Sequence, residues 1–172
     1  MILKAFKAKS NQNYINKLLK ARKAAVDQRK INSFGVILNI NEFKDFEAFR
    51  MYLKSLGIKS NKIKIIAFVE DEKEMGFHWE TYFNPKDFGW KGKINNVGLQ
   101  EFIETEFDAL ISFYKEDLME LDLITAQSKS NLKIGLSNND QRLYDLIIDV
   151  KPIDFEIFKS ELKKYLTVLN KL

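Results

Sequence analysis

Four polar side chains follow short apolar segments of the chain at positions where a ligand could bind. Asn39 and Asn41 come after one such segment, and Tyr114 and Lys115 close another. In open parallel sheets, ligands bind beyond the carboxyl ends of the strands. If both segments are parallel strands, these side chains share one edge of the sheet and could hold a nucleotide-like or phosphorylated compound. The alternative is a set of ordinary loop and capping residues.

Acidic and amide side chains follow two further apolar segments and could add acid–base or metal chemistry. Glu70 and Asp71 follow residues 63–69, and residues 137–140 read Ser-Asn-Asn-Asp. Paired carboxylates can hold Mg²⁺ or divide the roles of acid and base between them. However, neither form of the glycine-rich phosphate loop occurs in the sequence. We therefore assign no catalytic residue, no metal and no cofactor from the sequence.

An aromatic-rich segment, residues 77–90, contains the single histidine of the chain. His78 has acidic residues on both sides, so it could titrate near neutrality as an acid–base group, or it could be an ordinary strand residue. The aromatic side chains and the lysines near them could bind nucleic acid by stacking and charge, or the aromatics could pack in the core or in a covering loop. These residues are Phe77, Trp79, Tyr82, Phe83, Phe88 and Trp90, with Lys86, Lys91 and Lys93.

The first 30 residues are strongly basic. They hold nine Lys or Arg and one acid, a net charge of about +8, whereas residues 31–172 carry about −4. After Ser10, a predicted N-cap, apolar residues recur at helical spacing with lysines opposite them. Arg22 and Arg29 fall on the apolar side, where they need carboxylates, carbonyls or a bound anion.

This basic helix is the strongest candidate for a binding function. A dense array of lysines on one side of a helix is suited to nucleic acid, and the two arginines on the apolar side argue against a lipid surface. The alternative is a helix docked on the acidic remainder of the chain, with its lysines merely solvated. The predicted contact residues are Lys17, Lys20, Arg22, Lys23, Arg29 and Lys30.

The composition excludes several kinds of site. Cysteine is absent, which rules out disulfides, thiolate catalysis and cysteine-ligated metal centres, and fits a reducing compartment. No stretch approaches the roughly 18 apolar residues of a membrane span, and the first apolar run breaks on lysines too early for a signal peptide. We therefore expect a cytoplasmic protein.

The remainder of the chain alternates short apolar runs with amphipathic segments, which is typical of an α/β fold. The predicted strands are residues 34–38, 63–69, 107–114, 132–136 and 143–149, with an extended segment at 77–83. The predicted helices begin at Asn41, at Asn96, at about residue 117 and after Asp154. We expect a three-layer, Rossmann-like, mostly parallel sheet of five or six strands with helices on both faces. This domain spans residues 31–172 and follows a helical arm at residues 1–30.

Five segments spread over nearly the whole chain form a recognisable series. They read KSNQNYINKLL at 9–19, WKG at 90–92, FDALISFY at 107–114, SKSNLKIG at 128–135 and ELKKYL at 161–166. The series resembles an uncharacterised family of small bacterial proteins known only as a domain of unknown function, and this resemblance implies no activity. Residues 107–136 are also similar to the N-terminal Rossmann-like half of heptosyltransferase-type glycosyltransferases, although no sugar-nucleotide motif follows them.

These observations favour a non-catalytic binding or adaptor module whose basic N-terminal helix contacts RNA, a ribonucleoprotein or another acidic partner. The alternative is a small enzyme or ligand-binding protein that takes a nucleotide-like or phosphorylated molecule at Asn39, Asn41, Tyr114 and Lys115. A third alternative is a structural partner in a larger assembly, in which Arg22 and Arg29 pair with carboxylates of a second protein or a second copy.

Overall fold

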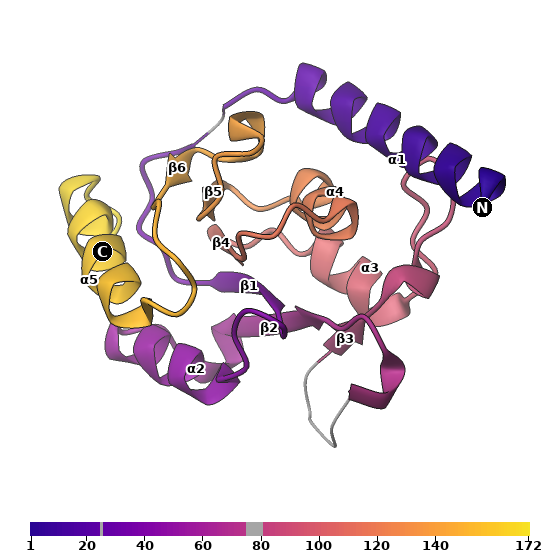
Figure 1. Ribbon diagram of the computed structural model, residues 1–172. Helices are drawn as coiled ribbons and strands as arrows, with labels where there is room; N and C mark the ends of the chain where they lie inside the picture. The colour runs from indigo at the N-terminus through magenta and orange to yellow at the C-terminus, as the bar shows by residue number, and fades with distance from the viewer. Residues whose placement is uncertain (25, 75–80) are drawn as a thin grey trace.

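Six parallel strands form the central sheet of the computed structural model, which describes residues 1–24, 26–74 and 81–172 (Figure 1). The strands are β1 (Phe34–Asn39), β2 (Ile63–Phe68), β3 (Thr81–Phe83), β4 (Ala109–Phe113), β5 (Leu132–Gly135) and β6 (Leu146–Ile147). They lie in the order β3-β2-β1-β4-β5-β6. The chain therefore starts in the middle of the sheet, adds β2 and β3 on one side of β1, and then adds β4, β5 and β6 on the other side. This switch point lies between β1 and β4, where doubly wound folds usually bind ligands.

Helices cover both faces of the sheet. Figure 1 shows α2 (Phe46–Ser55) and α5 (Phe155–Val168) on one face, and α3 (Val97–Glu104) and α4 (Met119–Gln127) on the other. Single 3-10 turns lie between these elements at η1 (Ser60–Lys62), η2 (Glu72–Glu74), η3 (Pro85–Asp87) and η4 (Gln141–Leu143). The predicted three-layer, Rossmann-like α/β architecture is confirmed, with a parallel sheet of six strands among the described residues.

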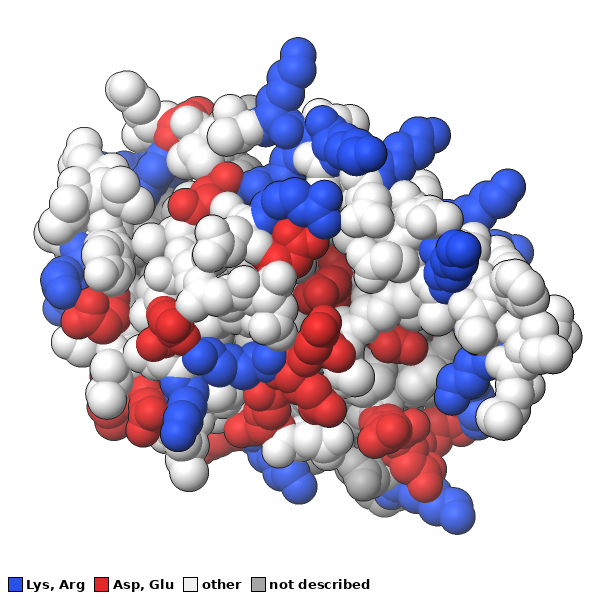
Figure 2. Space-filling view, turned by 45° about the horizontal axis from the view of Figure 1, so that its top comes forward, with Lys and Arg blue, Asp and Glu red and all other residues white. Residues whose placement is uncertain are grey.

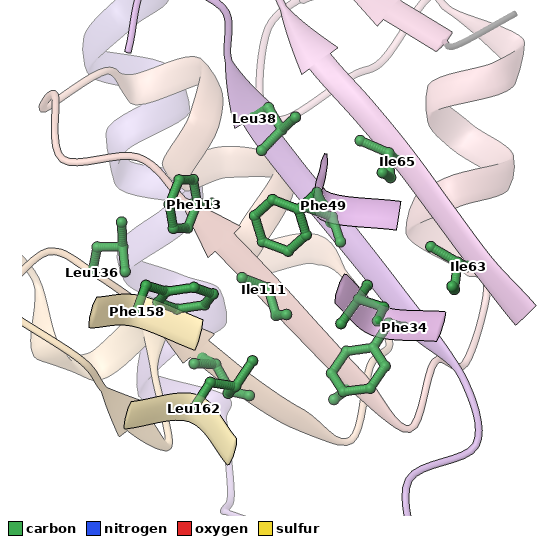
Figure 3. Close-up of a cluster of buried hydrophobic side chains, with 14 of the residues drawn as sticks. Phe34, Leu38, Phe49, Ile63, Ile65, Ile111, Phe113, Leu136, Phe158 and Leu162 are labelled. Atoms are coloured by element: carbon green, nitrogen blue, oxygen red, sulfur yellow. The ribbon is translucent and has the colours of Figure 1, made fainter. Parts of the chain in front are cut away.

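Phenylalanine rings fill the layer between the sheet and the helices α2 and α5 (Figure 3). The ring centroid of Phe113 on β4 lies 5.0 Å from that of Phe49 on α2 and 4.8 Å from that of Phe158 on α5. All three side chains are fully buried. Burying a ring of this size contributes about 1.5–3 kcal/mol relative to leaving it in water, so this cluster fixes both helices to the sheet.

The opposite layer packs just as closely. Ile37 on β1 and Leu110 on β4 point to this side, against buried residues of α3 and α4. A Cβ atom at Gly35 would lie 2.7 Å from the Phe107 ring, so only glycine fits there. Gly35 therefore allows close packing of β1 against this ring.

The N-terminal helix α1 (Ile2–Ala21) forms an additional outer layer over α4 (Figure 1). The predicted boundaries were wrong at both ends, since the helix begins eight residues before Ser10 and stops well before residue 30. It begins early because residues 2–9 contain no glycine or proline and are rich in good helix formers. It stops at Ala21 because Arg22 adopts an extended conformation, with its side chain bound to the domain.

One predicted helix cap differs from the structure and another agrees with it. Asp45, not Asn41, caps α2, because its side chain accepts a hydrogen bond of 2.9 Å from the Ala48 backbone N–H. The segment before Asp45 instead brings Phe43 to within 5.1 Å of Phe113, ring to ring. Asn96 does cap α3, as predicted, by accepting from the Leu99 N–H.

Candidate functional site

The switch point between β1 and β4 is bridged by side chains of the protein itself. The buried Asn39 amide donates to the Glu116 carboxylate over 2.9 Å and to Glu42 over 3.3 Å. The Glu42 carboxylate in turn accepts from the backbone N–H groups of Lys115 and Glu116. The crevice where a Rossmann fold usually takes its ligand is thus spanned by hydrogen bonds within the chain.

The four predicted edge residues do not converge on one point. Lys115 forms an ion pair with Asp149, whose other carboxylate oxygen accepts from Asn138. Asn41 is exposed, and only its backbone N–H joins the network, by donating to Asn39 Oδ1. Tyr114 points away from the other three, to the face of the sheet that α3 and α4 cover, because side chains alternate along a strand.

Tyr114 instead belongs to a buried hydroxyl network beneath α4. Its hydroxyl lies 2.9 Å from Thr125 Oγ1 and donates to Asp122 Oδ1 over 3.1 Å. The hydroxyls of Ser112 and Tyr144 complete the network. Burial raises the pKa of Asp122 to about 7, with smaller contributions from the carboxylates of Asp117 and Asp140. The network therefore holds one carboxyl group that titrates near neutrality.

The helix α1 is docked on the domain rather than free. Its buried side chains are Asn11, Ile15 and Leu19. Asn11 Nδ2 donates to the Gly89 carbonyl over 3.0 Å, and Asn11 Oδ1 accepts from the Gly92 N–H over 2.9 Å. This pair of bonds fixes the helix to the loop at residues 88–94, and the two apolar residues fix it to the core.

Arg22 and Arg29 are satisfied by acids of this chain. Arg22 Nη2 lies 2.6 Å from Asp145 Oδ1, and Arg22 Nη1 donates to the Arg142 carbonyl over 2.9 Å. Arg29 lies outside the helix and pairs with Asp27 at 2.6 Å on an exposed surface. Lys30 donates to Asn170 and to the Leu172 carbonyl. Three of the six predicted contact residues therefore have partners within the protein.

The lysines of α1 and the residues just beyond it remain without such partners. Within the described part of the chain, no carboxylate lies in ion-pair distance of any of these six side chains. Figure 2 shows lysine and arginine gathered along the margin where α1 lies, with acidic side chains across the middle of the same face. The six residues are Lys4, Lys7, Lys9, Lys17, Lys20 and Lys23.

Lys4, Lys7 and Lys9 were not among the predicted contact residues. The signal for them was present in the sequence, because the net charge of the first ten residues is as positive per residue as that of the rest of the arm. The predicted helix start at Ser10 placed them outside the helix. With α1 beginning at Ile2, they join Lys17 and Lys20 on one continuous helix about 30 Å long.

Trp90 differs from the other described aromatic residues of the segment 77–90 because it is 48% exposed. It borders a hollow of about 470 Å³ together with Lys4 and Lys7 of α1 and with Lys86. Phe83 and Phe88 are buried in the core, as the packing alternative predicted. The remaining residues of this prediction, Phe77, His78 and Trp79, lie outside the described residues.

Two searches of the described residues give negative results. None of the helices in residues 1–24, 26–74 and 81–172 is long and apolar enough to cross a membrane. Within the same residues, no group of three or more His, Cys, Asp or Glu side chains could hold a metal ion.

Comparison with known proteins places the chain in a family. Residues 7–169, from within α1 to the end of α5, match a family of unknown function, DUF6913. The chain belongs to this DUF6913 family. None of the curated proteins and none of the solved structures matches it. The expected resemblance to an uncharacterised family is confirmed, whereas the likeness of residues 107–136 to heptosyltransferase-type enzymes is not shown and stays a prediction.

Proposed function

We propose that this protein is a binding module that holds single-stranded RNA on the outer side of α1. The observation that carries the proposal is a set of six lysines, Lys4 to Lys23, that have no carboxylate partner among the described residues, five of them on a helix fixed to the domain and Lys23 just beyond it. Lysines that neutralise phosphates release condensed counterions, which is the main source of affinity for nucleic acids. A docked helix presents these lysines without the ordering cost that a free arm would have.

Trp90 supports RNA over other acidic partners. It lies partly exposed at the same end of the molecule as Lys4 and Lys7, at the edge of a shared hollow. Proteins that bind single strands combine basic grooves with aromatic side chains on which bases stack.

The test is a pair of charge reversals on the outer side of α1, Lys17→Glu with Lys20→Glu. Binding of a labelled single-stranded RNA is measured by fluorescence anisotropy at several salt concentrations. For single strands, each phosphate contact contributes about 0.7 to the slope of log K against log salt, so losing two contacts reduces that slope by about 1.4. Deleting residues 1–30 is a poorer test, because it removes Ile15 and Leu19 from the core.

The matched control reverses two exposed helical lysines on the other side of the sheet, Lys54→Glu on α2 and Lys163→Glu on α5. This variant has the same net charge as the test variant and is expected to keep the wild-type slope. Absence of RNA binding, binding that does not depend on salt, or an equal loss in both double variants would overturn the proposal.

A further inference from the structure

A cavity of about 510 Å³ lies at the amino edge of the sheet, opposite the edge where Rossmann folds usually bind ligands. It is formed where the end of α1 meets residues 106–108, which lead into β4, and residues 128–131, which connect α4 to β5. Its volume falls within the range of small-molecule sites, about 300–1,000 Å³. Its polar lining suggests which molecule it would take.

Lys133 is the central cation of this cavity. It lies on β5, is only 5% exposed, and has no carboxylate within ion-pair distance among the described residues. Its ammonium donates to the carbonyls of Thr125 over 2.7 Å and of Ala126 over 3.4 Å, in the last turn of α4. An ammonium group has three hydrogens, so one donor is left for a ligand.

Ser128 and Ser130 supply neutral donors beside this amine. Both line the cavity and both are more than nine-tenths buried. Their hydroxyl oxygens lie 2.7 Å apart, and the Ser130 N–H also donates to Ser128 Oγ. One hydroxyl hydrogen serves the bond between them, and the other has no acceptor among the described residues.

Arg22 adds a second positive charge to the lining of the cavity. It lines the cavity, and its positive charge lowers the pKa of Lys133, which burial and Arg22 together bring to about 8. One carboxylate, Asp145, compensates this pair of cations, and its Oδ2 is occupied by the Lys133 backbone N–H. An anion between the two cations would relieve their repulsion.

The acids and the other cations of the lining are largely engaged elsewhere. Asp108 accepts from the Asn32 N–H and the Ser33 hydroxyl at the start of β1. Arg29 pairs with Asp27, and Lys129 pairs with Glu104. The groups left to meet a ligand are therefore mainly donors, and the lining also contains Lys23 and Glu106.

We propose that this cavity binds the phosphate group of a small phosphorylated molecule, held by Lys133, Arg22 and the Ser128–Ser130 pair. Phosphate offers several acceptor oxygens and a double negative charge, which suits a site made of a buried amine, a guanidinium and hydroxyl donors. The site shares only Lys23 with the lysines proposed to bind RNA, and no variant used in either test changes that residue, so the two proposals can fail independently.

The test measures binding of inorganic phosphate and of a phosphate monoester, AMP, to the full chain by calorimetry and by amide chemical shifts of residues 128–133. Lys133→Met keeps the length of the side chain and removes its charge, and it is expected to weaken binding by about tenfold or more. Lys171→Met is the matched control, because Lys171 is also 5% exposed and donates to two backbone carbonyls, those of Asp27 and Arg29. It is expected to bind as the wild type does.

A second variant covers the case in which Lys133→Met does not fold. Ser128→Ala with Ser130→Ala retains every charge and is expected to weaken binding severalfold. Tighter binding of AMP than of inorganic phosphate would show that the organic part also contacts the cavity, and equal binding would show that the phosphate group alone is held. Absence of binding to the wild type would overturn the proposal. Binding that persists unchanged in both variants would indicate an adventitious ion only and would also overturn it.

The affinity for AMP is also expected to fall between pH 7.5 and pH 9.5, as the Lys133 ammonium, which faces Arg22 and Asp145, loses its proton. The slope should vanish in Lys133→Met. A wild-type affinity that is independent of pH over this range would contradict the role given to Lys133.

Discussion

Arg22 Nη2 and Asp145 Oδ1 lie 2.6 Å apart and join the end of α1 to the segment before β6. The Asp145 side chain is 9% exposed, and its second oxygen accepts from the Lys133 backbone N–H over 2.8 Å. One carboxylate therefore connects the helical arm, the sheet and the turn at η4. Arg22 therefore has its ionic partner within the chain, and this pairing explains why α1 ends at Ala21.

Removing the Asp145 carboxylate should cost more stability than removing an exposed partner of the same type. We expect Asp145→Ala to lower the free energy of unfolding by about 3 kcal/mol, because it leaves a largely buried guanidinium without its carboxylate and a backbone N–H without an acceptor. Asp27→Ala, which breaks the exposed pair with Arg29, should cost about 1 kcal/mol or less. Urea unfolding of both variants measures this difference, and equal losses would contradict it.

The protonation of Asp122 should make stability depend on pH. Its pKa rises from 3.8 to about 7 on folding, so between about pH 4 and pH 7 the folded state holds a proton that the unfolded state has lost. The free energy of unfolding should therefore decrease as the pH rises through this window. Asp122→Asn keeps an acceptor for Tyr114 and cannot ionise.

At pH 8 we expect Asp122→Asn to be more stable than the wild type by roughly 2 kcal/mol, a value discounted for partial contact with solvent. At pH 4 the two proteins should have similar stability. Urea unfolding at both pH values provides the measurement. Parallel pH profiles of the two proteins would show that Asp122 does not titrate in this range.

Gly92 should be far less tolerant of alanine than Gly57, although both have a positive φ. An added Cβ at Gly92 would lie 2.2 Å from the Tyr14 ring of α1, whereas nothing lies within 4 Å of one at Gly57. We expect Gly57→Ala to cost about 1 kcal/mol from backbone strain alone. Gly92→Ala should cost about 3 kcal/mol or more, because the loop must also move away from α1.

Thermal or urea unfolding of the two alanine variants gives the comparison directly. In the Gly92→Ala background, Tyr14→Ala should recover part of the lost stability, since it removes the ring that the new methyl group meets. A loss at Gly92 no larger than at Gly57 would mean that α1 is not held against this loop.

Trp90 should contribute to RNA binding without contributing to the salt dependence. Replacing an aromatic side chain that stacks on a base costs about 1–3 kcal/mol of binding free energy. We expect Trp90→Ala to weaken single-stranded RNA binding by that amount while the slope against log salt stays unchanged. Ile153→Ala removes another exposed apolar side chain, 84% exposed, and serves as the control. Loss of salt dependence in Trp90→Ala would contradict a stacking role.

The architecture could be predicted from local patterns because the apolar residues of the chain recur at spacings that are typical either of buried strands or of amphipathic helices. The run Phe34 to Leu38 is apolar at every position, as a strand covered on both faces must be, and it is fully buried. Asn96 and Gly57 mark a helix start and a helix end by their intrinsic backbone and side-chain chemistry. Strand order depends on contacts between distant segments, which such patterns do not record.

The cavity and the hydroxyl network could not be predicted for the same reason. Lys133 and Arg22 are 111 positions apart in the sequence, and they line the same cavity only because α1 lies over α4. Lys133 also lies inside a strand pattern, Leu-Lys-Ile-Gly, where a lysine is expected to face solvent. Asn39 and Lys115 lie at one edge of the sheet because Asn39 ends β1 and Lys115 comes shortly after β4, two neighbouring parallel strands.

The contacts of α1 join residues that are very far apart in the chain. Asn11 binds residues 78 and 81 positions later, and Arg22 binds one 123 positions later. During synthesis the helix leaves the ribosome well before any of these partners, and an isolated helix of this length is only marginally stable in water. We therefore expect docking of α1 to be among the last steps of folding, so that a segment made before the rest of the domain becomes ordered after most of it.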